Sequence, residues 1–153
     1  MAVIEFDRSI LGKEFVLGTF QVTEDMMLGF ARAVGETDPK YVDPEAAKKG
    51  PTGGLIAPPI FYDVFRADQL PDPKVKFGKV AFNAGQRCEF YAPIRPGDTI
   101  TMKTRVTDVY EKTGRTGKMV FIVRETRYEN QQGEKVAVVE QSQVRRESGA
   151  GRE

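Results

Sequence analysis

Two carboxylates, Glu36 and Asp38, lie two residues apart in the segment Gly35-Glu36-Thr37-Asp38-Pro39-Lys40-Tyr41. Such a pair can be tuned by its surroundings so that one carboxylate acts as a general base. The alternative is structural, because Asp-Pro is a common turn signal. In that interpretation Asp38 caps a turn before Pro39, and Glu36 remains in solvent.

The sequence contains no histidine, and this limits the acid–base chemistry available to it. No other side chain has an unperturbed pKa near 7. A general acid or base would therefore have to be a carboxylate, lysine, tyrosine or cysteine. The composition excludes zinc sites of the His–Cys type, Ser–His triads and Cys–His dyads. Since no P-loop or G-x-G-x-x-G pattern occurs either, we expect neither a cofactor nor a metal.

The composition is typical of one globular domain, with 40% hydrophobic and 29% charged residues in 153. Lys and Arg total 23 against 22 acidic residues, so a basic face for nucleic acid is not expected. No apolar run approaches the ~20 residues that span a membrane, and residues 1–5 lack the start of a signal peptide. The single Cys88, interpreted as a small core residue, excludes an internal disulfide and agrees with a reducing cytoplasm. We expect a cytoplasmic domain over residues 1–147 and a disordered tail over 148–153.

The first half of the chain predicts three helices. Thr23 is a suitable N-cap for a helix that Gly35 can terminate. Asp43 and Pro44 have the residue types that begin a second, short helix. A third helix, strongly apolar, is expected to begin near Pro59 and to bury Phe61, Val64 and Phe65.

The second half predicts strands, because apolar residues recur with period two from Val80 onward. An earlier strand is expected near 15–20, and the last near 136–144. The connections 114–117 and 130–133 have hairpin length, so consecutive strands must run antiparallel. Periodicity alone therefore predicts an α+β domain with a long curved sheet.

Three blocks occur in order along the chain: FARAVGETDP at 30–39, GLIAPP at 54–59 and PIRPGD at 93–98. In this order and spacing they resemble the MaoC-like family of (R)-specific enoyl-CoA hydratases and 3-hydroxyacyl dehydratases. The similarity runs from about Lys13 to Arg146. It is greatest to the N-terminal, FAS1-like dehydratase domain, which lacks the catalytic pair. The resemblance implies a single hot-dog fold, in which an antiparallel sheet wraps around a central helix.

The hydratase motif of this family reads G-D-x-N-P-x-H, and its Asp and His together activate water. Glu36 stands at the Asp position, Asp38 at the Asn position and Tyr41 at the His position. A phenol with a pKa near 10 is a poor base at neutral pH, and Asn83 stands where the family often has another His. The resemblance therefore implies substrate binding without catalytic residues. The substrate-binding residues that it implies are Glu36, Asp38, Tyr41, Gly54, Ala57, Pro58 and Phe61.

Some of these residues have structural alternatives. The hydroxyl of Tyr41 can contact an acyl thioester, or the ring can pack under the short helix. Gly53 and Gly54 can offer N–H donors to a thioester carbonyl, or they can form a tight connection that needs glycine.

The resemblance implies a subunit in fatty acid metabolism that binds acyl-CoA or acyl-ACP. Its partner, with the same fold, would supply the Asp and His for (R)-specific hydration or 3-hydroxyacyl dehydration. One alternative is a hot-dog thioesterase that uses Asp63 or Glu36, although Asp63 has a plainer interpretation as an exposed or paired residue. Another is a non-enzymatic homodimer that binds an acyl thioester. No nucleic acid or membrane partner is expected.

Overall fold

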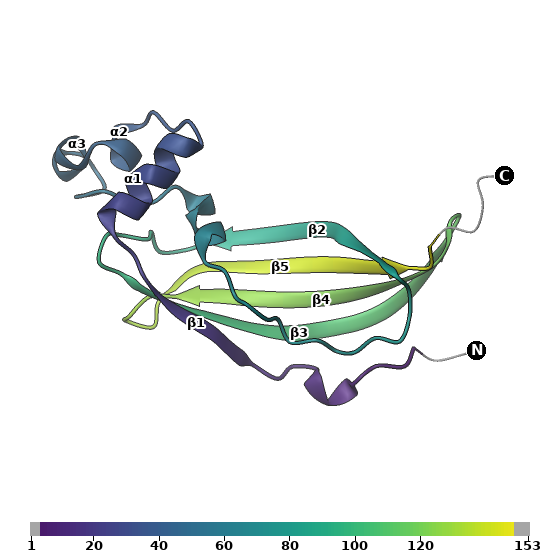
Figure 1. Cartoon of the computed structure of the whole chain (residues 1–153). Coiled ribbons are helices and arrows are strands. Elements are labelled where there is room, and N and C mark those ends of the chain that lie inside the picture. The colour runs from purple at the N-terminus through teal and green to yellow at the C-terminus, as the bar shows by residue number, and fades with distance from the viewer. Residues whose placement is uncertain (1–3, 149–153) are drawn as a thin grey trace.

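The computed structural model describes residues 4–148, while residues 1–3 and 149–153 lie outside the description. One curved antiparallel sheet dominates the molecule, with strand order β1-β3-β4-β5-β2 (Figure 1). The strands are β1 Phe15–Gln21, β2 Val80–Phe90, β3 Thr99–Gly114, β4 Gly117–Glu129 and β5 Lys135–Arg146. The α+β class and the antiparallel sheet expected from the sequence are confirmed. Except for Ser148, the expected tail lies outside the described residues.

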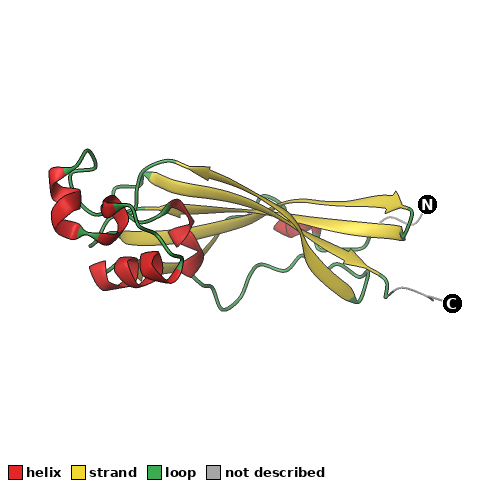
Figure 2. Cartoon of the chain, turned by 90° about the horizontal axis from the view of Figure 1, so that it is seen from above, coloured by secondary structure: helices red, strands yellow, loops and turns green. Residues whose placement is uncertain are grey.

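The helices gather at one end of the sheet, apart from a short 3₁₀ turn, η1 (Arg8–Ile10) (Figure 2). They are α1 Glu24–Ala33, α2 Pro39–Val42, α3 Pro44–Lys49 and the 3₁₀-helix η2 Pro59–Val64. The hydroxyl of Thr23 accepts a hydrogen bond from the Met26 N–H at 3.2 Å, which caps α1. Gly35 follows the helix with φ of +78°, and the Asp43 side chain caps α3. These predicted helix ends are confirmed, whereas α2 was not predicted.

The third predicted helix is present as η2, a 3₁₀-helix of six residues. Pro58 is its N-cap and Pro59 its first residue, and neither supplies an N–H. Runs of 3₁₀-helix rarely extend beyond a few residues. Phe61 and Phe65 are buried as expected, with 0% and 3% exposure. Val64 is only half-buried, because Tyr62 takes the other buried position of this short helix.

An irregular segment, residues 66–79, connects η2 to β2 and crosses one face of the sheet (Figure 1). We name this segment the strap, and the sheet face that it covers the inner face. The guanidinium of Arg124 on β4 donates two hydrogen bonds to the Pro71 carbonyl, at 3.2 and 3.0 Å. Arg145 on β5 donates to the Val75 carbonyl at 3.1 Å. At Gly78 a Cβ would lie 2.7 Å from the Arg146 backbone oxygen, so only glycine allows the strap to approach β5 this closely.

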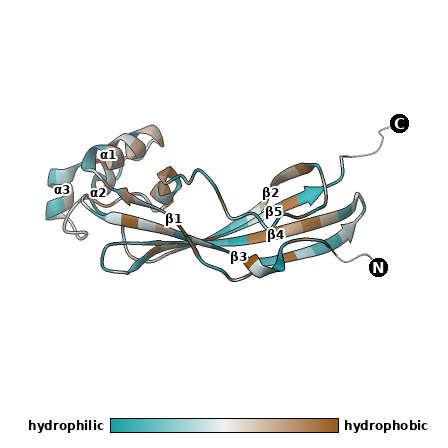
Figure 3. Cartoon of the chain, turned by 60° about the horizontal axis from the view of Figure 1, so that its bottom comes forward, coloured by the Kyte–Doolittle hydropathy of each residue, from teal (hydrophilic) through white to brown (hydrophobic). Residues whose placement is uncertain are grey.

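The core consists of two clusters along the inner face. The larger lies near the helices and includes Met27, Phe61, Phe65 and Ile100. The second lies under the strap and consists of Ile10, Val75, Val106, Val120 and Ile122. Hydrophobic and hydrophilic residues follow one another along the strands, as expected for a sheet with one buried face (Figure 3).

Candidate functional site

The segment with the two carboxylates forms the start of α2. The Asp38 side chain accepts a hydrogen bond from the Lys40 N–H at 3.1 Å and so caps this helix. Its second oxygen lies 3.4 Å from the Lys40 ammonium, and this contact raises the pKa of Lys40. The structural interpretation of Asp38 is therefore confirmed. Glu36 is half-buried, and its N–H is bonded to the Ala31 carbonyl.

An apolar cavity of about 160 Å³ lies beside this segment. It brings together three of the residues singled out in the sequence: Tyr41, Ala57 and Pro58. The rest of its wall comes from Ile56, Pro59, residues 90–94, Val136 and Ala137. Tyr41 is half-buried. The connection from Ile56 to Pro59 thus faces β5 and the segment after β2 across a space that suits an aliphatic group.

Other residues singled out in the sequence lie away from this cavity. Glu36, Asp38, Gly54 and Phe61 do not contribute to its wall. The Phe61 ring is fully buried and makes edge-to-face contacts with Phe30 and Phe65, at centroid distances of 5.4 and 5.6 Å. Phe61 is therefore a core residue and does not line the cavity.

The connection before Pro58 offers few free N–H groups. The Gly53 N–H is bonded to the Gly50 carbonyl, Ile56 to Lys40, and Ala57 to Ile94. Within residues 4–148, the Gly54 N–H makes no hydrogen bond. Of the two glycines expected as donors, Gly54 is thus the one left free; the Leu55 N–H is likewise unbonded within residues 4–148.

A second cavity, of about 200 Å³, lies on the inner face between η2, the start of the strap and the sheet. We name it the inner-face cavity. Tyr62 separates it from the apolar cavity, because its ring packs against Phe90 on one side and Tyr128 on the other, with centroid distances of 6.0 and 5.3 Å. The Tyr62 hydroxyl accepts a hydrogen bond from Gln86 at 2.5 Å and lies 3.2 Å from the Cys88 sulfur. Burial raises the pKa of Tyr62, and that of Tyr128 to about 12.

Sequence reasoning missed this cavity, although part of its signal was present. Arg124, Thr126 and Tyr128 alternate along β4, so their side chains point to the same face. The apolar run 119–123 turns polar from Arg124 onward, but the sequence alone does not identify the partners on β2 and β5. Cys88, expected in the core, is half-buried at the margin of the larger cluster.

Asp63 lies at the rim of the inner-face cavity. Its side chain is 62% exposed and lies 3.7 Å from the Arg66 guanidinium. The plainer interpretation of Asp63, an exposed and paired acid, is confirmed.

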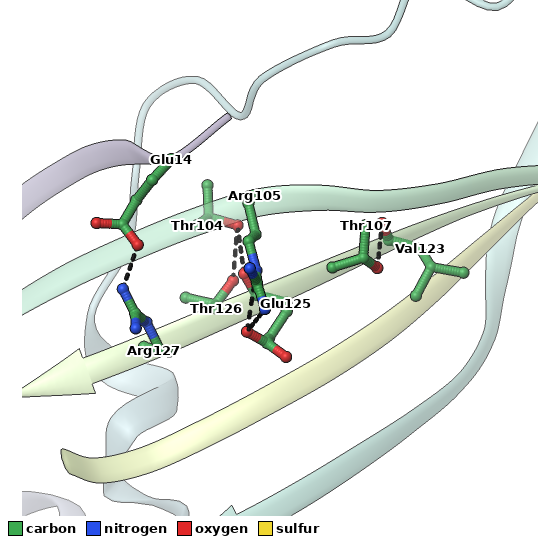
Figure 4. Close-up of polar contacts among 8 residues, drawn as sticks. All are labelled: Glu14, Thr104, Arg105, Thr107, Val123, Glu125, Thr126 and Arg127. Atoms are coloured by element: carbon green, nitrogen blue, oxygen red, sulfur yellow. Dashed lines mark hydrogen bonds and ion pairs between the residues drawn. The ribbon is translucent and has the colours of Figure 1, made fainter. Parts of the chain in front are cut away.

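The outer face of the sheet carries ion pairs. Figure 4 shows Arg105 of β3 paired with Glu125 of β4, and Arg127 of β4 paired with Glu14. The Arg105–Glu125 contact is 2.9 Å. A shallow hollow on this face is lined by Arg87, Glu89, Tyr91, Arg105, Glu125, Arg127, Lys135, Val138 and Glu140. The lining has four cations and three carboxylates, and its Arg127 is paired with Glu14 outside the hollow, so little excess charge is offered to a ligand.

Strand β2 forms an edge of the sheet and pairs only with β5. Its residues are exposed except for the half-buried Cys88. Large hydrophobic side chains are among them: Val80 is 37% exposed, Phe82 42% and Phe90 48%. An edge strand with exposed apolar residues is a surface that proteins usually cover.

Residues 9–139 match the sequence family described as "FAS1-like, dehydratase domain region". The chain belongs to this family. A relative of this dehydratase domain is a UPF0336 protein of Thermobifida fusca, 30% identical over 115 residues, which are 71% of the chain and 75% of the relative.

Solved structures show the same fold. A MaoC-like dehydratase from Rhodospirillum rubrum superposes with a TM-score of 0.69 at 24% identity, over 92% of this chain and 94% of that one. A chain of the HadBC (3R-hydroxyacyl-ACP dehydratase) complex from Mycobacterium tuberculosis does so with a TM-score of 0.66 at 25% identity, over 90% and 98%. The expected hot-dog fold and the MaoC-like, FAS1-like resemblance are confirmed.

Two further observations concern the described part of the dehydratase domain. None of its helices has the length and apolarity needed to cross a membrane. Between residues 4 and 148, no three Cys, Asp or Glu side chains cluster in a way that could hold a metal ion.

Proposed function

We propose that this FAS1-like dehydratase domain is a non-catalytic, acyl-thioester-binding subunit that acts in the cytoplasm. It completes a dimer with a hot-dog partner that bears the catalytic Asp and His. The pair acts in (R)-3-hydroxyacyl-CoA or -ACP dehydration, or in the reverse hydration.

The observation that carries this proposal is Tyr41 at the wall of the apolar cavity, in a chain without histidine. Hydration of an enoyl thioester needs a base that takes a proton from water and an acid that returns one to the α-carbon. Each positioned group typically contributes about 10²–10⁴-fold. A tyrosine at the histidine position is a poor base, while the cavity beside it suits an acyl chain.

The residues proposed to bind substrate have different positions relative to this cavity. Tyr41, Ala57 and Pro58 would contact the acyl thioester directly. The free N–H of Gly54 would donate to the thioester carbonyl. Glu36 and Asp38 do not line the cavity, so they would reach the bound thioester only in the assembled dimer. Phe61 would act from behind by holding the wall in place.

The exposed edge of β2 supports the partner. A second hot-dog domain that pairs with this edge would satisfy its free backbone groups and cover Val80, Phe82 and Phe90. The HadBC relative is itself described as a complex of a 3R-hydroxyacyl-ACP dehydratase, which favours two different subunits over a homodimer.

The catalytic part is tested by assaying the purified chain for hydration of crotonyl-CoA and octenoyl-CoA, alone and with a MaoC-like subunit that has the intact Asp/His motif. We expect no turnover by the chain alone and turnover by the mixture above that of the added subunit. Turnover by the chain alone that is lost in Glu36→Gln would show that one carboxylate suffices, and would refute the proposal. Thioester cleavage instead of hydration would favour the thioesterase alternative, with Asp63→Asn and Glu36→Gln identifying the carboxylate.

The partner surface is tested by light scattering on the same mixture. Phe82→Lys places a charge on the β2 edge and should prevent assembly. Val16→Lys is the matched control, because Val16 is 64% exposed on the opposite edge strand, β1. Assembly that tolerates Phe82→Lys but fails with Val16→Lys would place the interface on the β1 edge and would refute the proposed use of the β2 edge.

A further inference from the structure

Polar side chains form a row across the inner face of the sheet. A cavity that held only an aliphatic chain would be lined by apolar side chains there. Register pairs Arg124 of β4 with Gln141 of β5, and Gln141 with Gln86 of β2. All three line the inner-face cavity. In the neighbouring row, the hydroxyls of Thr104 and Thr126 are bonded to one another at 3.0 Å (Figure 4). The floor of this cavity can therefore recognise a polar group.

The Tyr128 hydroxyl is the strongest sign of a ligand. The residue is only 5% exposed, and it lines the cavity. Among residues 4–148 its hydroxyl has no hydrogen-bond partner. Only Arg146 Nε is both sealed from solvent and without a partner in this part of the chain, so the Tyr128 oxygen is open to the cavity and free to bond a group that enters it. Burial also holds the pKa of Tyr128 at about 12, so the group remains a neutral donor and acceptor at physiological pH.

The charged side chains around the cavity already have partners within the protein. Asp63 and Arg66 at the rim form one pair. The Arg124 guanidinium is held by the Pro71 carbonyl through two of its nitrogens, and burial lowers its pKa. The remaining polar groups, the Tyr128 phenol and the Gln141 amide, match a hydroxyl or a ketone.

The Tyr62 ring lies between Phe90, which lines the apolar cavity, and Tyr128, which lines the inner-face cavity. The Tyr62 hydroxyl is bonded to Gln86, an exposed residue whose amide can exchange this bond for water. An acyl chain too long for the apolar cavity would therefore reach the inner-face cavity by displacing Tyr62.

We propose that the inner-face cavity selects acyl groups whose distal part carries a hydroxyl or keto oxygen, with Tyr128 and Gln141 as the residues that determine this specificity. The proposal rests on the proposed function, because it presumes an acyl thioester in the neighbouring cavity. It adds the class of acyl group, which neither the fold nor the sequence family specifies.

The test compares matched thioesters by calorimetric titration of the full chain: octanoyl-CoA with ω-hydroxyoctanoyl-CoA, and decanoyl-CoA with ω-hydroxydecanoyl-CoA. A hydroxyl that entered an apolar pocket would weaken binding. We expect the hydroxyl to strengthen binding instead. For at least one acyl-chain length, the hydroxylated thioester should bind about tenfold more tightly than the unmodified one. Tyr128→Phe and Gln141→Leu should each remove most of this preference, measured as the ratio of the two affinities within each matched pair.

Tyr110→Phe is the control, because Tyr110 stacks on Phe121 and contributes to neither cavity. It should leave the preference intact. If both members of every pair bind but the unmodified thioester binds equally or more tightly, the inference fails and the proposed function stands. A preference that survives both Tyr128→Phe and Gln141→Leu would also overturn the inference. If no thioester binds, the proposed function fails, and the inference with it.

Discussion

Replacing Phe61 by alanine is expected to destabilise the folded chain by about 3–5 kcal/mol, the usual effect of a Phe→Ala change in a core. The structure favours the upper half of this range. The ring has no exposed surface, and it lies between Phe30 and Phe65 in two edge-to-face contacts. Each such contact is typically worth about 0.5–1.5 kcal/mol beyond buried area. The cavity cannot easily collapse, because η2 is held between the prolines before it and the strap after it.

Urea unfolding followed by circular dichroism measures this effect. With a slope of about 2 kcal/mol/M, a loss of about 4 kcal/mol lowers the midpoint by about 2 M. Protein concentration must be the same in each measurement, since association would shift the apparent stability. Val16→Ala is the control, because an exposed substitution should change the stability by no more than about 0.5 kcal/mol.

A small effect of Phe61→Ala would contradict the reasoning. A loss below about 1 kcal/mol would mean that the ring does not fill the core described here. Loss of acyl-CoA binding with unchanged stability would mean that Phe61 contacts the substrate directly.

Two further predictions concern a helix cap and a buried phenol. Thr23→Ala should lower the stability by about 1 kcal/mol, because the N-cap of α1 is lost, and thermal unfolding should register a fall of about 2–4 °C. Tyr128 has a pKa raised to about 12, above the ~10 of an unfolded tyrosine, so its stabilising effect is complete below pH 10 and is lost as pH rises toward 12. The stability of wild type relative to Tyr128→Phe should thus fall by about 1 kcal/mol between pH 9 and pH 11, as measured by urea unfolding. An unchanged difference would show an unperturbed phenol.

Features determined by neighbours in sequence could be predicted from the sequence. Thr23 and Gly35 mark the ends of α1 because a cap acts within one helical turn. The strands follow from period two, and the hairpins from short connections. The family blocks then supplied the arrangement of these elements in a hot-dog fold.

Features determined by register could not be predicted. The row Arg124–Gln141–Gln86 depends on the register of two strand pairs, β4–β5 and β2–β5, each of which has an irregularity. A shift of one residue would turn these side chains to the other face. The bond from Arg124 to Pro71 joins residues 53 apart in sequence. The division of the interior by Tyr62 depends on the η2 geometry, which two prolines alone do not specify.

The strap allows the space over the inner face to change in size while the sheet remains as it is. An α-helix across the inner face could change its length only by whole turns if the same side chains were to keep facing the sheet. A segment without regular structure, attached by Arg124 and Arg145 through main-chain carbonyls, is free of that constraint. Each doubling of a flexible loop costs only about 0.6 kcal/mol, and a carbonyl acceptor exists at nearly every residue. Insertions and deletions between Pro71 and Val75 are therefore a route by which related chains, natural or engineered, could enlarge or reduce the space over the sheet while keeping every strand in register.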